Sequence, residues 1–191
     1  MNKNRIIILL ASVVVIAVFA AIFNFYNHSS NRLMTNISNS LVRVTPGEMV
    51  KQSDLIIIGT VKGLKTAKAP SVLQKGEEDI VTNVNISVEK YLSNPNNLSL
   101  SEIVVQTVGG TIDKETMVAE DSPSFEEGER AVVFLQKKDD NTFTVYGWSQ
   151  GKYTINNGNI AGNEKEKDIF RGIFGKDMTL DEFEKEIELL K

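Results

Sequence analysis

The side chains best suited to binding lie in one short stretch, where Trp148, Gln150, Gly151, Lys152 and Tyr153 follow one another closely. An aromatic face beside an amide suits a sugar or a peptide, because the ring supplies apolar contact and the amide both donates and accepts hydrogen bonds. A lone tryptophan also commonly fills the interior of a small barrel. Trp148 therefore has two readings, as a ligand-binding residue or as part of the core.

The pair Gly109-Gly110 is the second candidate for ligand contact. Without a Cβ, glycine lets the backbone approach a ligand closely, but it also serves turns and bulges that need a positive φ. We therefore take Gly109, Gly110, Trp148 and Gln150 as the candidate ligand-binding residues.

Catalytic residues are harder to find. The chain has no cysteine, and its only histidine, His28, follows the apolar N-terminal segment closely. Ser-His-Asp catalysis and the HExxH zinc motif both need a rigidly held histidine, and no GxxxxGK[ST] or GxGxxG motif occurs. The sequence predicts no enzymatic activity, no metal site and no cofactor.

Carboxylates are the remaining chemistry. Asp113, Glu115, Glu120 and Asp121 lie close together and could bind Ca²⁺ through oxygen ligands, but the EF-hand spacing is absent and a solvated acidic loop is the favoured interpretation.

Three further carboxylates precede a predicted strand. Glu126, Glu127 and Glu129 could act as acid and base, or could form a solvated turn. Convergence of Asp113, Glu120 and Glu129 in one pocket would favour a hydrolase, and dispersed acids would favour binding.

The N-terminal segment from Ile6 to Phe23 is 18 residues long and contains no charge. As a helix it would be about 27 Å long, close to the thickness of the hydrocarbon core of a bilayer. Its length favours a retained signal anchor over a cleaved signal peptide, although Ala20 and Ala21 could precede a cleavage site. Lys3 and Arg5 precede the segment, so the positive-inside rule places the N-terminus in the cytoplasm and the rest outside.

Charge limits the choice of partners. Without Lys3 and Arg5, residues 28–191 carry 19 basic and 25 acidic residues, a balance of −6. Because a nucleic-acid-binding surface needs clustered Lys and Arg, nucleic acid is not an expected partner. Four Asn-X-Ser acceptor patterns for glycosylation, at Asn27, Asn36, Asn85 and Asn97, are compatible with export but do not establish it.

Three regions follow from composition: a signal anchor or transmembrane helix at 1–26, a flexible Asn- and Ser-rich tether at 27–44, and an extracytoplasmic domain at 45–191. The predicted strands lie near residues 55–61, 80–88, 102–108, 130–136, 142–147, 153–155 and 159–161. The polar stretch between the first two is expected to be a hairpin loop or flap. Residues 111–121 carry no regular pattern.

Two helices have clear start signals. Thr45 and Glu48 form a potential capping box around a short helix to Gln52, and Thr179 and Glu182 form another at the start of a C-terminal helix. The apolar residues of that last helix recur at spacings of three and four, so one face should pack on the sheet. The sequence thus predicts a mainly β fold, a small OB-like antiparallel barrel with a C-terminal α-helix, with a two-sheet sandwich as the alternative.

The order of these features resembles the netrin-like module and the N-domain of tissue inhibitors of metalloproteinases. The resemblance rests on three segments spread over residues 46–155: Ser53 to Val61, Val88 to Leu92, and Phe125 to Leu135. It implies an OB-type barrel. Those inhibitors insert an N-terminal cysteine into a zinc site, so their mechanism cannot apply to a chain without cysteine. The pattern is also similar to uncharacterised exported prokaryotic proteins.

The function expected from these observations is a membrane-anchored extracytoplasmic binding or interaction module, whose partner is a protein or another envelope component. One alternative is a carboxylate- or metal-dependent envelope hydrolase. Another is an accessory subunit of a membrane complex in which the N-terminal helix itself makes contacts. If the anchor is cleaved, the domain would be secreted.

Overall fold

The computed structural model describes residues 33–37, 42–71, 76–139, 141–162 and 178–191. These residues form a mainly β structure with two α-helices, one of them C-terminal, which confirms the predicted class. The expected transmembrane helix at 1–26 lies outside the described residues. Within the described ranges, no helix is both long and apolar enough to cross a bilayer.

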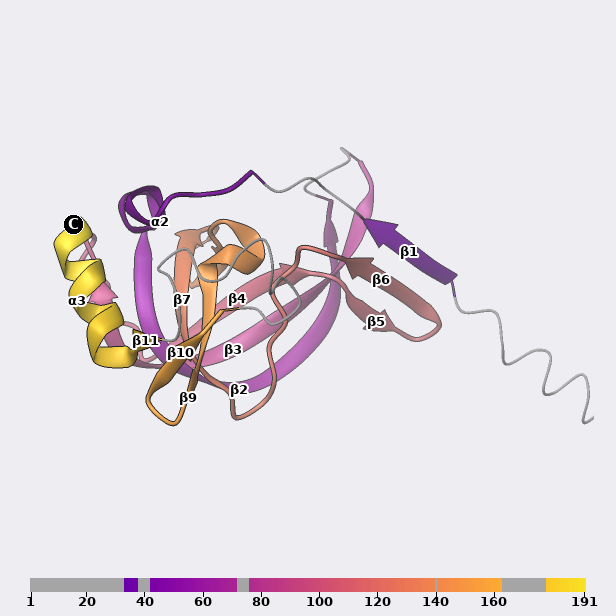
Figure 1. Cartoon of the computed structure of the whole chain (residues 1–191). Coiled ribbons are helices and arrows are strands. Elements are labelled where there is room, and N and C mark those ends of the chain that lie inside the picture. The colour runs from indigo at the N-terminus through magenta and orange to yellow at the C-terminus, as the bar shows by residue number, and fades with distance from the viewer. Residues whose placement is uncertain (1–32, 38–41, 72–75, 140, 163–177) are drawn as a thin grey trace, which may run out of the picture. The chain divides into compact units, whose positions relative to one another are not determined.

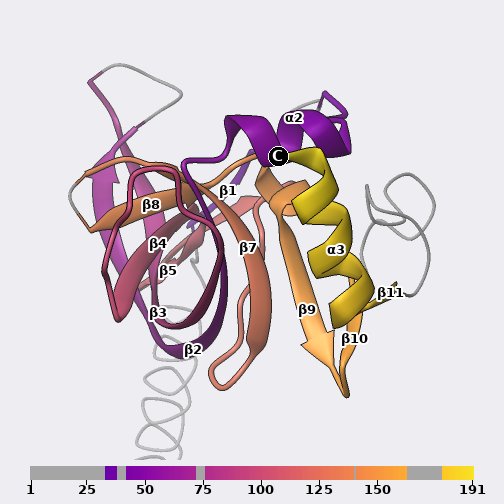
Figure 2. The same cartoon turned by 90° about the vertical axis from the view of Figure 1, so that its left-hand side faces the viewer.

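Five strands pair in a cycle, in which β2 pairs with β3, β3 with β4, β4 with β8, β8 with β7, and β7 again with β2. Only the β4–β8 pair of this cycle is parallel. Figure 1 and Figure 2 show β2 and β3 as long, strongly curved strands. The bounds are β2 Leu55–Pro70, β3 Glu78–Ser93, β4 Glu102–Val108, β7 Arg130–Lys137 and β8 Thr142–Val145.

The sheet continues beyond β7 through β9 (Lys152–Asn156), β10 (Asn159–Ala161) and β11 (Met178–Thr179). The turn between β9 and β10 has positive φ at Asn157 and Gly158, as the Asn-Gly signal predicts. A separate sheet has the order β1-β6-β5, with β1 at Leu33–Ile37, β5 at Gly110–Ile112 and β6 at Glu115–Ala119. Strand β1 lies within the predicted tether.

The central strands β2 and β7 are buried on both faces, as the continuous apolar run at residues 55–61 predicts. Leu55 and Ile57 belong to one core cluster, together with Val133 and Leu135 of β7. The intervening side chains, such as that of Ile56, enter a second cluster on the opposite face. Successive strand residues point to opposite faces, so an apolar run with no polar alternation is what two cores require.

The second core lies between the sheet and the helices α2 (Pro46–Gln52) and α3 (Leu180–Leu190). From α3, Phe183 and Ile187 are both 1 % exposed. The Phe183 ring lies 5.1 Å from that of Tyr153 and 6.3 Å from that of Phe134, measured between centroids. The predicted apolar face of the C-terminal helix therefore does pack on the sheet.

Two regions differ from the sequence-based expectation. The expected loop or flap before residue 79 is largely strand, because β2 runs to Pro70 and pairs with β3 as far as Glu78. In β2 no residue after Val61 is buried, and this part of the strand, rich in lysine, threonine and alanine, lacks the apolar alternation that reveals a strand. The irregular stretch at 111–121 contains the β5–β6 hairpin, whose strands are too short and too exposed to leave a pattern.

Both predicted capping boxes are present. In α3 the main-chain N–H and hydroxyl of Thr179 donate to Glu182, and in α2 Thr45 does the same for Glu48. The hydrogen bonds from the main chain and then the side chain of Thr179 hold the pKa of Glu182 below its usual value of 4.5. Each cap therefore stabilises its helix through an ionised carboxylate.

This lowered pKa predicts an acid-dependent loss of stability. Because the folded-state pKa of Glu182 is depressed, its contribution is complete above about pH 4.5 and is lost as the pH falls through the lowered value. We expect a Glu182→Gln variant to be less stable than the wild type at neutral pH, and the difference to shrink as the pH falls below about 4.5. Thermal unfolding followed by circular dichroism measures this difference, and one that is constant with pH would contradict the role of the charge.

Candidate functional site

The most distinctive feature of the sheet is the place where its two parallel strands separate. Strands β4 and β8 share only two paired positions, Val104 with Thr142 and Val105 with Phe143. Beyond these, β8 pairs with β7 as far as Val145, and β4 pairs with β3 as far as Val108. The ends of β4 and β8 thus have no pairing with each other in the described residues.

A cleft of about 560 Å³ lies at this separation. Successive residues of both strands line it: Gln106, Thr107 and Val108 of β4, and Thr144 and Val145 of β8. Because neighbouring residues of a strand point to opposite faces, a cleft lined by consecutive residues reaches the edge of each strand. Its apolar wall includes Val81, Val108, Pro123, Val145, Tyr146 and Trp148.

Trp148 lies in this wall and belongs to neither core cluster. It is the first residue of the short 3₁₀ helix η1 (Trp148–Gly151), with a φ of 56°, and Gly147 before it also has a positive φ, of 72°. A Cβ on Gly147 would lie 2.9 Å from Met49 Cε, so the turn is closely packed against α2. The half-buried Trp148 thus lines the cleft and is in neither core cluster, the other position that the sequence left open.

Gln150 also borders the cleft, but its amide is already used. The side chain is 4 % exposed. Its Oε1 accepts a hydrogen bond from the Val44 main-chain N–H at 3.0 Å, and its Nε2 donates to the carbonyl oxygens of Val42 at 3.1 Å and Gly147 at 3.3 Å. Gln150 therefore fastens the segment that precedes α2, and this segment forms part of the cleft wall.

Gly109 and Gly110 lie next to the cleft and are not among its lining residues. Their φ angles are 110° and 139°. A Cβ on Gly110 would lie 2.6 Å from Thr66 Cγ2 and 2.8 Å from Thr82 Oγ1. The close backbone approach that a glycine pair permits is thus made to the β2–β3 ribbon of the chain itself.

Polar groups on the cleft wall offer further contacts. The Ser122 hydroxyl lines the cleft, is buried, and makes no hydrogen bond within the described part of the chain. Its neighbour Asp121, which is not among the lining residues, also has a buried Oδ2 with no hydrogen bond in the described residues, and its main-chain carbonyl accepts from the Ser149 N–H at 3.1 Å. Lys138, at the other end of the lining, donates from Nζ to Gln106 Oε1.

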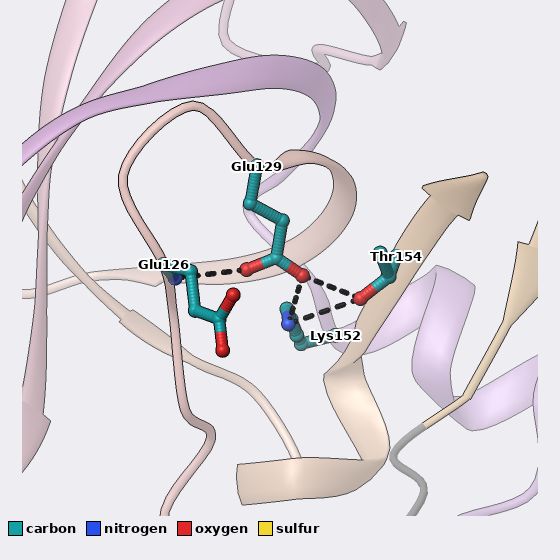
Figure 3. Close-up of polar contacts among 4 residues, drawn as sticks. All are labelled: Glu126, Glu129, Lys152 and Thr154. Atoms are coloured by element: carbon teal, nitrogen blue, oxygen red, sulfur yellow. Dashed lines mark hydrogen bonds and ion pairs between the residues drawn. The ribbon is translucent and has the colours of Figure 1, made fainter.

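The rest of the predicted binding surface is buried. Tyr153 is 3 % exposed and belongs to the second core. The side chain of Lys152 is 10 % exposed and forms an ion pair with Glu129, drawn in Figure 3. Of that stretch, only Trp148 and Gln150 line the cleft.

The ion pair is part of a small polar network. Lys152 Nζ donates to Thr154 Oγ1 at 3.1 Å, and Thr154 Oγ1 donates to Glu129 Oε1. Glu129 Oε2 accepts from the Glu126 main-chain N–H at 3.1 Å, and the Phe125 ring centroid lies 5.2 Å from Lys152 Nζ. Among the glutamates predicted to form a solvated turn, Glu126 and Glu127 are exposed, whereas Glu129 is partly buried, with its side chain 10 % exposed and its charge paired with that of Lys152.

The acidic residues proposed for metal binding do not gather in one place. Asp113 is exposed in the β5–β6 turn, Glu115 pairs with Lys68 at 2.7 Å, and Glu120 is exposed after β6. Among the residues that the structure describes, no group of three or more His, Asp or Glu side chains is placed to hold a metal ion.

Comparison with known proteins adds no relative, since the sequence matches no protein-family model and no curated protein is significantly similar to it.

Proposed function

We propose that the protein is a membrane-anchored extracytoplasmic binding module that acts without catalytic residues and binds its partner in the cleft between β4 and β8. The observation that carries this proposal is the cleft itself, whose apolar wall includes Trp148, the only tryptophan of the chain. Its volume of about 560 Å³ is within the range of about 300–1,000 Å³ that is typical of ligand sites.

An OB-like barrel is part of this proposal. The cyclic pairing of five strands, with one parallel pair, supports it. In OB folds, ligands bind on the second and third strands, between the loop that joins the first two strands and the loop that joins the last two. Here the cleft is lined by β3 and β4, by Pro70 and Asp79 at the end of the β2–β3 ribbon, and by Lys138 between β7 and β8. The position of the cleft and the order of the strands therefore support the same interpretation.

The membrane topology is proposed from the sequence. The uncharged segment from Ile6 to Phe23, preceded by Lys3 and Arg5, supports an anchor with a cytoplasmic N-terminus and an extracytoplasmic domain. Secretion after cleavage is the alternative. The cleft wall includes Val42 and Val44, so in an anchored protein the cleft lies where the chain leaves its tether.

A capture experiment distinguishes a binding domain from an accessory subunit held by its helix. The tagged full-length protein is crosslinked in cells beside two controls, the anchor alone and the domain behind an unrelated membrane span. We expect a partner that is captured with both domain-containing proteins and not with the anchor alone. A partner that requires the native span and not the domain would instead support the accessory-subunit alternative.

No observation favours the hydrolase alternative over binding. Of the three carboxylates whose convergence would have indicated it, Asp113 and Glu120 are exposed on the β5–β6 region and Glu129 is paired with Lys152.

A further inference from the structure

The main chain at the cleft is suited to bind another strand. Gly109 donates its N–H to the Ile80 carbonyl at 2.7 Å. Counting back from Gly109 in steps of two, Thr107 and Val105 of β4 therefore also direct their main-chain groups towards β3. In an antiparallel ladder the intervening residues direct theirs to the other side. The main-chain groups of Gln106 and Val108 therefore face the β8 side, which agrees with the hydrogen bond from the Val104 N–H to the Asn141 carbonyl.

The same reasoning applies to β8. Tyr146 donates its N–H to the Phe134 carbonyl of β7 at 2.9 Å, and Lys138 of the same hairpin donates to the Thr142 carbonyl at 2.9 Å. The main-chain groups of Val145, one position before Tyr146, therefore point away from β7 and towards the cleft. Two strand edges thus face the cleft where β4 and β8 no longer pair.

One exposed charge in the described lining favours a particular ligand side chain. The lining includes two charged residues, Lys138, which is exposed, and Asp79, which is only 6 % exposed and already interacts within the chain. Lys138 Nζ contacts Gln106 of β4. An acidic ligand side chain beside Gln106 would therefore lie near a positive charge.

We infer that the cleft binds an extended peptide segment, which adds as an antiparallel strand to the free edge of β4, with an acidic residue beside Gln106 and near Lys138. Addition of a strand to a sheet edge is an established mode of peptide recognition, in which the main chain supplies affinity and side-chain pockets supply specificity. Antiparallel addition is the more stable arrangement. This inference rests on the proposed binding function and names its ligand class.

The fluorescence of Trp148 provides the measurement, because it is the only tryptophan of the chain and lies in the cleft. Purified full-length protein is titrated with the peptide Thr-Lys-Val-Thr-Val-Glu-Thr, acetylated and amidated at its ends. Three comparison peptides are used: one with Lys and Glu exchanged, and two that are N-methylated at every second residue in the two alternating phases.

We expect binding of the first peptide, and binding about tenfold or more weaker for the exchanged peptide and for at least one N-methylated peptide, which loses its main-chain donors. Lys138 is exposed, so its replacement should leave the fold intact. A Lys138→Glu variant should prefer a further peptide, in which Lys replaces the Glu of the original sequence, to the original peptide.

Two outcomes would overturn the inference and leave the proposed function standing. If both N-methylated peptides bind as tightly as the unmodified peptide, the cleft binds side chains without strand addition. Absence of binding by every peptide, with a partner still captured through the domain in cells, would show that the ligand is not an extended peptide. Failure of both experiments would remove the proposed function as well.

Discussion

Replacing Lys152 with methionine is expected to lower the free energy of unfolding by about 3 kcal/mol, the largest effect of any change considered. The substitution keeps the length and apolar stem of the side chain but leaves the Glu129 carboxylate buried without its cation. Both side chains are only 10 % exposed, so water cannot replace the lost partner. Urea unfolding of the two proteins at neutral pH measures the difference.

Two controls separate the buried ion pair from a general effect of removing a lysine. The pair Lys90–Glu184 lies at the surface, with side chains 55 % and 24 % exposed, so Lys90→Met should cost less than about 1 kcal/mol. The double variant Lys152→Met with Glu129→Gln removes the unpaired charge and should recover at least half of the loss. Equal effects of Lys152→Met and Lys90→Met would contradict the role assigned to the buried pair.

Gly59→Ala is expected to destabilise the protein by about 2 kcal/mol, because it overpacks the point where β2 is shared between β3 and β7. A Cβ at Gly59 would lie 2.5 Å from Ile86 Cγ2 and 2.7 Å from the Ser87 carbonyl oxygen. The β2–β3 register shifts between Ile58 and Gly59, so the glycine lies where the strand bends. The midpoint of urea unfolding reports the loss.

Gly63 provides the matched control, since it lies in the same strand and has nothing within 4 Å of the position of a Cβ. Gly63→Ala should be neutral or slightly stabilising, because it reduces the freedom of the unfolded chain. If both alanines have the same effect, the close contact of β2 with β3 at Gly59 is not the cause.

Signals contained in a few consecutive residues predicted the structure well. Thr45 with Glu48, and Thr179 with Glu182, form the expected capping boxes because a cap depends only on residues within one turn. The apolar run of β2 was equally informative, since burial on both faces leaves no polar alternation. The part of β2 after Val61 has no buried residue and so carries no such signal, which explains why the strand up to Pro70 was missed.

Contacts between distant segments decided the rest. Glu129 is separated from Lys152 by 23 residues, and nothing in either local sequence indicates that the strand pairing of β7 and β9 brings them together. The same is true of the cleft, which exists because β4 and β8 separate after two paired positions. Trp148 and Gln150 are near neighbours in the chain, but the hydrogen bond between Gln150 and the Val44 N–H joins residues that are 106 positions apart.

Site-specific photo-crosslinking in cells tests most directly the central claim that a partner binds in the cleft. A photo-crosslinking amino acid replaces Gln136, which lines the cleft, or Glu186, which is exposed on α3. The account predicts that the full-length protein captures a reproducible partner from position 136, that position 186 does not, and that Trp148→Ala weakens the capture. Capture from position 186 with none from position 136 would contradict it and would place the binding surface on the helical side of the domain.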